Sequence, residues 1–118
     1  MKNFLAVFTG TAEASEKSGW NALSESARNV RTQAGIRAWH AWMESHQKQI
    51  VVAGGPIGKT KRVSGSGTAS AQNNLCGYIV VSAESHEAAA KLFENHPHFS
   101  IFPGEAVEVM ECLPVPGA

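Results

Sequence analysis

The sequence lacks an excess of either charge, a long apolar run and a cysteine framework. Ten basic residues balance ten acidic ones, so nothing favours nucleic acid or an anionic membrane as a partner. No apolar run approaches the roughly 20 residues of a membrane span. The first apolar run, Phe4 to Phe8, is shorter than the apolar segment of a signal peptide. We therefore expect a cytoplasmic protein.

The two cysteines, Cys76 and Cys112, are too far apart for a C-x-x-C metal pattern. Both fall in predicted strands, so we interpret them as small buried apolar residues in a reducing compartment. No histidine has a third ligand at a recognisable spacing, so no metal site is expected. We also expect no cofactor.

Gly58-Lys59-Thr60 resembles the end of a phosphate-binding loop. The full pattern requires glycine where Ala53 stands, and it requires a helix immediately afterwards. The residues that follow are not helical, so nucleotide binding is excluded. We interpret Lys59, Lys61 and Arg62 as a solvated hairpin edge.

A chain of 118 residues with 43% hydrophobic and 17% charged residues is typical of a globular protein, and we expect one domain over 1–118. The pattern predicts strands over 3–8, 50–53, 75–81 and 106–113, with helices over 24–47 and 85–95. Ser24 and Ser85 are predicted N-caps. Pro97 is predicted to stop the second helix. Residues 9–19 are expected to be a loop or an irregular turn, and 58–74 a long, mobile hairpin connection.

The long helix carries two apolar strips. The first contains Ala27, Val30, Ala34, Ala38, Ala41 and Trp42, and beside it lies a second with Ile36, Trp39 and Met43. Gly35 weakens the helix centre by about 1 kcal/mol relative to alanine.

The order β-α-β-β-α-β predicts an α+β, ferredoxin-like fold, with a four-stranded antiparallel sheet and two helices on one face. The first three strands are apolar on both faces. The chain has no further element to cover the second face, so we expect a homodimer.

Three segments resemble the YciI-like family, also called YCII-related or DGPF. They are Ala53-Gly54-Gly55-Pro56-Ile57, the run from Gly77 to Ala89, and His96-Pro97-His98. The resemblance covers most of the chain. It implies a ferredoxin-like fold that pairs into a dimeric α+β barrel.

Members of that family have been proposed to use a histidine on the first helix and an aspartate before the last strand. The aspartate position is His96 in this chain. The helix position falls near Ala38 when counted without gaps, or at His40 with a small deletion. The resemblance therefore carries over no lytic or hydrolytic activity.

His96 and His98, on either side of Pro97, are the first candidate catalytic residues, as acid–base groups at the mouth of a cavity. The alternative is that His96 caps the C-terminus of the preceding helix, where a positive charge is favourable. If a site exists, we expect it to include His96 or His98 and to lie under the long helix.

His40 is a further catalytic candidate, with a surface histidine as the alternative. Trp42 is a candidate ligand-binding residue, and core or dimer packing is its alternative. Glu108 is a second ligand-binding candidate, because alternation sends Glu108 and Glu111 to opposite faces and one of them could be buried. Such a carboxylate would be paired with an arginine of the long helix or a histidine of the turn, whereas a solvated strand end is the alternative.

Three functions remain open. The first is an enzyme acting on an unknown small organic molecule in a pocket near the 96–98 turn. The second is a dimeric module that binds a small ligand, or is associated with stress, without turnover. The third is a dimeric barrel that binds haem or another cofactor, which an absorbance spectrum would reveal.

Overall fold

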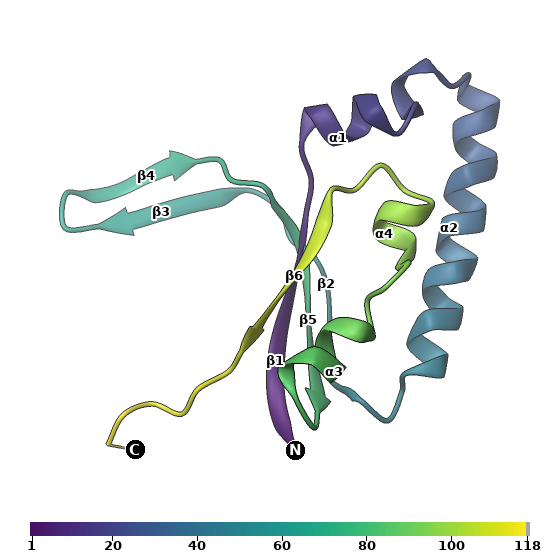
Figure 1. The fold of residues 1–118 in the computed structure, drawn as a ribbon. Coiled ribbons are helices and arrows are strands. Elements are labelled where there is room, and N and C mark those ends of the chain that lie inside the picture. The colour runs from purple at the N-terminus through teal and green to yellow at the C-terminus, as the bar shows by residue number, and fades with distance from the viewer. Residues whose placement is uncertain (118) are drawn as a thin grey trace.

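The chain folds into a four-stranded antiparallel sheet whose helices all lie on one face (Figure 1). The computed structural model describes residues 1–117. The sheet contains β1 (Lys2–Thr9), β2 (Ile50–Pro56), β5 (Leu75–Ala83) and β6 (Ala106–Glu111), in the spatial order β2-β5-β1-β6. Each neighbouring pair is antiparallel. The predicted α+β, ferredoxin-like fold class is confirmed.

Both predicted N-caps are present. Ser24 precedes α2 (Glu25–Ser45), and its Oγ accepts the backbone N–H of Ala27 at 3.2 Å. Ser85 precedes α3 (His86–Lys91), and its Oγ accepts the N–H of Ala88 at 3.0 Å. Each hydroxyl satisfies a backbone donor that the first helical turn leaves free, which fixes where the helix begins.

The loop predicted over 9–19 is wrong. The segment forms α1 (Ala12–Lys17), followed by the 3₁₀ turn η1 (Trp20–Ala22). Thr11 caps α1 by accepting the N–H of Ala14 at 3.0 Å. Gly19 lies between α1 and η1 with φ 79°, a left-handed conformation that glycine adopts at little cost. The glycines at 10 and 19 therefore border a short helix instead of marking a loop.

The second predicted helix is shorter than expected. It ends at Lys91, and a separate helix, α4 (Pro97–Ser100), begins after a turn in which Asn95 has φ 57°. Pro97 stands at the first position of α4, where a missing N–H costs nothing. The proline thus begins the helix α4, in addition to preventing the preceding helix from continuing.

The long helix is rotated from its predicted orientation. Val30 of the predicted main strip is 69% exposed and Ala41 is also exposed. The buried positions are Gly35 and Trp42. A Cβ at Gly35 would lie 2.5 Å from the ring of Phe102, so this glycine is where the helix admits an aromatic side chain. Contacts of bulky aromatic side chains determine which face of the helix is buried, and the spacing of the alanines does not reveal these contacts.

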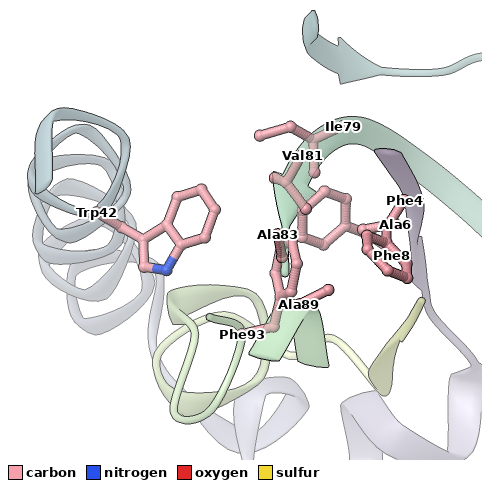
Figure 2. Close-up of a cluster of buried hydrophobic side chains, with 9 residues drawn as sticks. All are labelled: Phe4, Ala6, Phe8, Trp42, Ile79, Val81, Ala83, Ala89 and Phe93. Atoms are coloured by element: carbon pink, nitrogen blue, oxygen red, sulfur yellow. The ribbon is translucent and has the colours of Figure 1, made fainter. Parts of the chain in front are cut away.

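The core lies between the sheet and the helices. Phe4, Ala6 and Phe8 alternate along β1 and face the helices, and the Trp42 indole points from α2 toward the sheet (Figure 2). The cluster is completed by residues of β5, α3 and the turn after it, namely Ile79, Val81, Ala83, Ala89 and Phe93. The alternation places the intervening residues of β1 on the opposite face.

That opposite face carries apolar side chains that none of the helices in residues 1–117 covers (Figure 1). The antiparallel register sets Leu5 opposite Val80 and Met110, and Val7 opposite Tyr78. Tyr78 and Met110 are 37% and 38% exposed. No helix in the described part of the chain is long and apolar enough to cross a membrane.

Residues 60–71 form a hairpin that projects to the left of the sheet in Figure 1. It consists of β3 (Thr60–Ser64) and β4 (Gly67–Ala71), which pair only with each other. The sequence predicted a hairpin connection here but not these two strands. Lys59, Lys61 and Arg62 are exposed, as their interpretation as a solvated edge requires.

Candidate active site between the long helix and the sheet

A cavity of about 440 Å³ lies between α2 and the strands β2 and β5. Its size falls in the range of small-molecule sites. The lining is mostly aromatic and apolar, and consists of Phe8, Ile36, Trp39, His40, Met43, Ala53, Gly54, Gly55, Pro56, Cys76, Gly77, Tyr78, Ile79, His98 and Phe102. Its lining includes two imidazoles, an indole and a thiol and no Asp, Glu, Lys or Arg, whereas the side chain of Tyr78, paired opposite Val7, lies on the other face of the sheet.

The wall formed by β2 depends on glycine. Gly54 has φ 63°, and a Cβ there would lie 1.9 Å from the carbonyl oxygen of Tyr78. The register of β2 against β5 shifts between Ile50 and Gly55, so this strand is bulged along the cavity. Gly54-Gly55-Pro56, which the sequence suggested would stop the strand, instead continues it with an irregular edge.

His98 is held in one orientation at the cavity wall. It is 7% exposed, and its Nε2 lies 2.7 Å from the carbonyl oxygen of Thr9. A carbonyl oxygen can only accept, so Nε2 carries the proton and, in the neutral ring, Nδ1 keeps a free lone pair. Within residues 1–117, Nδ1 of His98 has no hydrogen-bond partner, and it is not fully buried. It is therefore the atom of this ring available to a ligand.

Two further contacts fix that ring. The Thr9 carbonyl also accepts the N–H of Glu105 at 2.9 Å, and the Thr9 hydroxyl donates to the Glu105 carboxylate at 3.0 Å. A Cβ at Gly104 would lie 2.3 Å from Nε2 of His98, so only glycine lets the loop lie against the ring. The end of β1 and the loop before β6 thus form the support for His98.

Burial lowers the pKa of His98 below its ordinary value, and its hydrogen bond to Thr9 opposes this only in part. The ring is consequently neutral near pH 7. A neutral imidazole with a free Nδ1 can accept a proton from a bound molecule.

His96 lies behind the cavity wall, fully buried among aromatic rings. Its ring centroid is 4.5 Å from that of Trp39, 4.8 Å from that of Trp42 and 5.2 Å from that of Phe8. Its Nδ1 accepts the backbone N–H of His98 at 3.0 Å. The proton is therefore on Nε2, the one buried side-chain N or O atom in residues 1–117 without a hydrogen-bond partner.

The interpretation of His96 as a positively charged C-cap of the preceding helix is wrong. His96 is instead the N-cap of α4, with a neutral imidazole. Burial, together with the nearby His98 and His46, lowers the pKa of His96 to about 4. A charged ring would lose its hydration among these aromatic neighbours with no anion to compensate it.

The structure brings His40 to the same cavity as His98. His40 is exposed and reaches the lining from α2. Trp42 does not line the cavity, because its indole lies in the core and its Nε1–H donates to the carbonyl of Leu92 at 2.8 Å. Trp39, one turn earlier on α2, is the indole that faces the cavity.

Glu108 lies on the other side of the sheet. It is exposed and stands opposite Val7, on the face away from α2 and the 96–98 turn. Glu111, on the helix side, is 3.2 Å from Nζ of Lys2. The expected partners of a buried glutamate, an arginine of α2 or a histidine of the turn, are therefore wrong for both residues.

Cys76 is a cavity residue that the sequence interpretation missed. Neither Cys76 nor Cys112 is the buried residue that was expected, since both are free and exposed. Nevertheless, Sγ of Cys76 donates to the carbonyl of Phe8 at 3.1 Å, and burial of the thiol raises its pKa. It is thus a neutral thiol. In the sequence, the only indication of this position was that Cys76 lies beside the apolar run of β5.

No group of three His, Cys, Asp or Glu residues within 1–117 could hold a metal ion.

The fold and the cavity together define a ferredoxin-like α+β domain with a ligand-sized site between its long helix and its sheet. No protein-family model and no curated protein matches the chain. A solved structure that resembles it is 5-chloro-2-hydroxyhydroquinone dehydrochlorinase (TftG) from Burkholderia phenoliruptrix AC1100, in complex with 2,5-dihydroxybenzoquinone. The match has a TM-score of 0.53 and 19% identity, and covers 91% of this chain and 89% of that chain. At this identity the likeness shows the fold alone.

Proposed function

We propose that this protein is an enzyme acting on a small, flat organic molecule in the cavity under α2, with His98 as its acid–base group. One observation carries the proposal. The His98 imidazole is anchored through Nε2–H to the Thr9 carbonyl, its Nδ1 has no hydrogen-bond partner within residues 1–117, and the residue lines a cavity of about 440 Å³. An imidazole held in one tautomer is preorganised to accept a proton.

The lining suggests the substrate class. Phe8, Trp39 and Phe102 offer aromatic surface against which a planar ring can stack. Since the lining carries neither carboxylate nor Lys or Arg, it suits an uncharged molecule or a weak acid. The similar dehydrochlorinase acts on a chlorinated hydroxyhydroquinone and was solved with a dihydroxybenzoquinone. We infer a hydroxylated ring as the substrate class here.

The chemistry available is proton transfer. Nδ1 of His98 takes the proton of a ring hydroxyl, which leaves a phenolate on the substrate and an imidazolium whose Nε2–H stays bonded to Thr9. On a chlorinated hydroxyhydroquinone, the imidazolium returns the proton to the ring carbon that bears chlorine. A second hydroxyl then loses its proton to water as the C–Cl bond breaks, so that chloride leaves and a hydroxyquinone remains with no oxidant required. His40, at the exposed side of the cavity, is the second group able to exchange protons with solvent.

Membership of the YCII-related family and a dimeric state belong to the same proposal. The apolar open face, with half-buried Leu5 and Val80 and exposed Met110, supports pairing of two sheets face to face. Such an interface would exceed about 1,000 Å². Light scattering at micromolar concentration should give the mass of a dimer, and the mass of a single chain would contradict it.

The test of function uses 2,5-dihydroxybenzoquinone as a probe and 5-chloro-2-hydroxyhydroquinone as a trial substrate. Quenching of tryptophan fluorescence reports binding, because Trp39 lines the cavity. Chloride release reports turnover. His98→Gln should lower the turnover rate by about 10²–10⁴-fold.

The matched control is His86→Gln. His86 also bonds a carbonyl through Nε2, that of Val109 at 2.7 Å, but does not line the cavity. This variant should retain turnover. Quenching without turnover in the natural protein would favour a binding module. Equal behaviour of His98→Gln and the natural protein toward both compounds would contradict the role of His98.

A further inference from the structure

We propose that the β3–β4 hairpin is an arm that clasps a second copy of this chain, with its basic side chains neutralising Glu108 of that copy. The inference rests on the sheet-face dimer proposed above. It gives a function to a segment that contributes nothing to the core and to a glutamate that lies outside the cavity.

The arm lies on the side of the sheet that a second copy would occupy. In Figure 1 the helices lie to the right of the sheet and the hairpin extends to the left, beyond the uncovered face. Residues 61–70 are all exposed. The radius of gyration is 16.3 Å, against roughly 13.5 Å for a compact domain of this length. The arm and the C-terminal segment both project from the body of the domain in Figure 1.

The arm is purely basic. Residues 57–74 contain Lys59, Lys61 and Arg62 and no acidic residue. The Nζ of Lys61 donates to the hydroxyl of Ser70 at 2.9 Å, a neutral partner within the arm. The arm, together with Lys59 immediately before it, therefore presents three positive charges and no anion of its own.

Glu108 is the acidic group that sheet pairing would desolvate. Its Cα partner on β1 is Val7, and Met110, two residues on, shares its face. A second sheet that covers these apolar residues also covers the Glu108 carboxylate, which has neither an ion pair nor a hydrogen bond within residues 1–117. A carboxylate taken out of water without a cation is strongly unfavourable.

Few cations can reach that carboxylate. Lys2 faces the helix side, where it pairs with Glu111, and Lys48 is in the turn joining α2 to β2. The other basic residues outside the arm lie on α1, α2 and α3, across the sheet from Glu108. By elimination, the arm is the source of positive charge on the open side.

The strand order makes the pairing geometrically consistent. The arm follows β2, at one edge of the sheet, and Glu108 lies on β6, at the opposite edge. A two-fold axis parallel to the strands lays the β2 edge of one sheet over the β6 edge of the other. Each copy then gives one arm and receives one, as a self-complementary interface requires.

A charge-swap series measured by analytical ultracentrifugation tests the clasp. The variants are Lys59→Glu/Lys61→Glu/Arg62→Glu, the single change Glu108→Lys, and the combination of all four. Either reversal alone should raise the dimer Kd by about tenfold or more, and the combination should restore it to within about threefold of the natural protein. The matched control, Arg37→Glu/Lys48→Glu/Lys91→Glu, changes net charge equally on the helix side and should leave the Kd within about threefold.

Two results would overturn the clasp, and they differ in what else they overturn. A natural dimer whose Kd is unaffected by the arm reversal, or a combined variant no tighter than the single reversals, removes the clasp and leaves the sheet-face dimer standing. A natural protein that stays a single chain at about 100 µM removes both. Near-UV circular dichroism of each variant verifies that the protomer remains folded.

Discussion

The backbone N–H of His98 donates to Nδ1 of His96 at 3.0 Å, so the two candidate histidines share one hydrogen bond. Through it, a fully buried imidazole caps the short helix α4. The helix in turn carries the imidazole that lines the cavity. His96 is therefore a positioning residue in the core, and His98 is the residue that a ligand can touch.

Two substitutions of His96 should separate the contribution of its N-cap hydrogen bond to stability from that of its packing. His96→Ala loses the cap and leaves a void among aromatic rings, which should lower the free energy of unfolding by about 3 kcal/mol. His96→Asn retains an acceptor suited to an N-cap and should lose about half as much. Urea unfolding measures both. Equal losses in the two variants would show that capping contributes nothing.

Acid should begin to destabilise the protein as the pH falls below 6.5. His96 has a pKa of about 4 when folded and an ordinary value of 6.5, so between these pH values the unfolded chain binds a proton that the folded chain does not. Stability is thus fully present above pH 6.5 and falls by up to about 1.4 kcal/mol per pH unit as the pH drops toward 4. The lowered pKa of His98 acts in the same direction.

Chemical denaturation at a series of pH values measures this slope. His96→Asn should reduce the slope and leave only the part due to His98. A natural protein equally stable at pH 6.5 and 4.5 would show that these imidazoles titrate normally in the folded state.

Gly104→Ala should disable the site and lower stability. The new methyl group would overlap both the His98 ring and the His98 backbone carbonyl oxygen, so the ring must move away from Thr9 and the loop must shift as well. We expect a loss of about 1–3 kcal/mol from overpacking and much weaker quenching by 2,5-dihydroxybenzoquinone. Gly58→Ala, whose Cβ would meet no atom within 4 Å, is the control and should bind the probe normally. Normal binding by Gly104→Ala would mean that the anchoring of His98 is dispensable.

Shortening the arm should leave the protomer intact. Replacing residues 61–70 with Asn-Gly keeps the paired positions Thr60 and Ala71 and supplies a tight turn. Because the removed residues are all exposed, the near-UV circular dichroism of the tryptophans should be unchanged. Loss of the folded signal would instead reveal a structural role for the hairpin.

The parts of the fold governed by local chemistry were predictable from sequence. The short apolar run from Phe4 to Phe8 predicted the strand β1, and the hydroxyl groups of Ser24 and Ser85 predicted where two helices begin. These features depend on residues only a few positions apart, so they can be predicted without knowledge of the tertiary structure.

The parts that depend on distant contacts were not predictable. Gly35 was interpreted as a weak point of the helix, yet its function is to admit the ring of Phe102, far along the chain. His96 was interpreted as the end of one helix, whereas the aromatic residues of α2 and β1 bury it at the start of another. Likewise, the carbonyl of Thr9 gave no sequence signal, because any residue carries a carbonyl and only the fold brings this one to His98.

The backbone carbonyl oxygen of Thr9 accepts hydrogen bonds from the His98 ring and from the backbone N–H of Glu105, so both of its lone pairs are in use. It stands at the last position of β1, where a shift of one residue in pairing would turn this carbonyl to the other side. A molecule with β1 out of register therefore has no oriented imidazole at all. Under the proposed function, only chains with β1 in the correct register would bind a ligand, so the stoichiometry of a ligand titration would also give the fraction of native molecules.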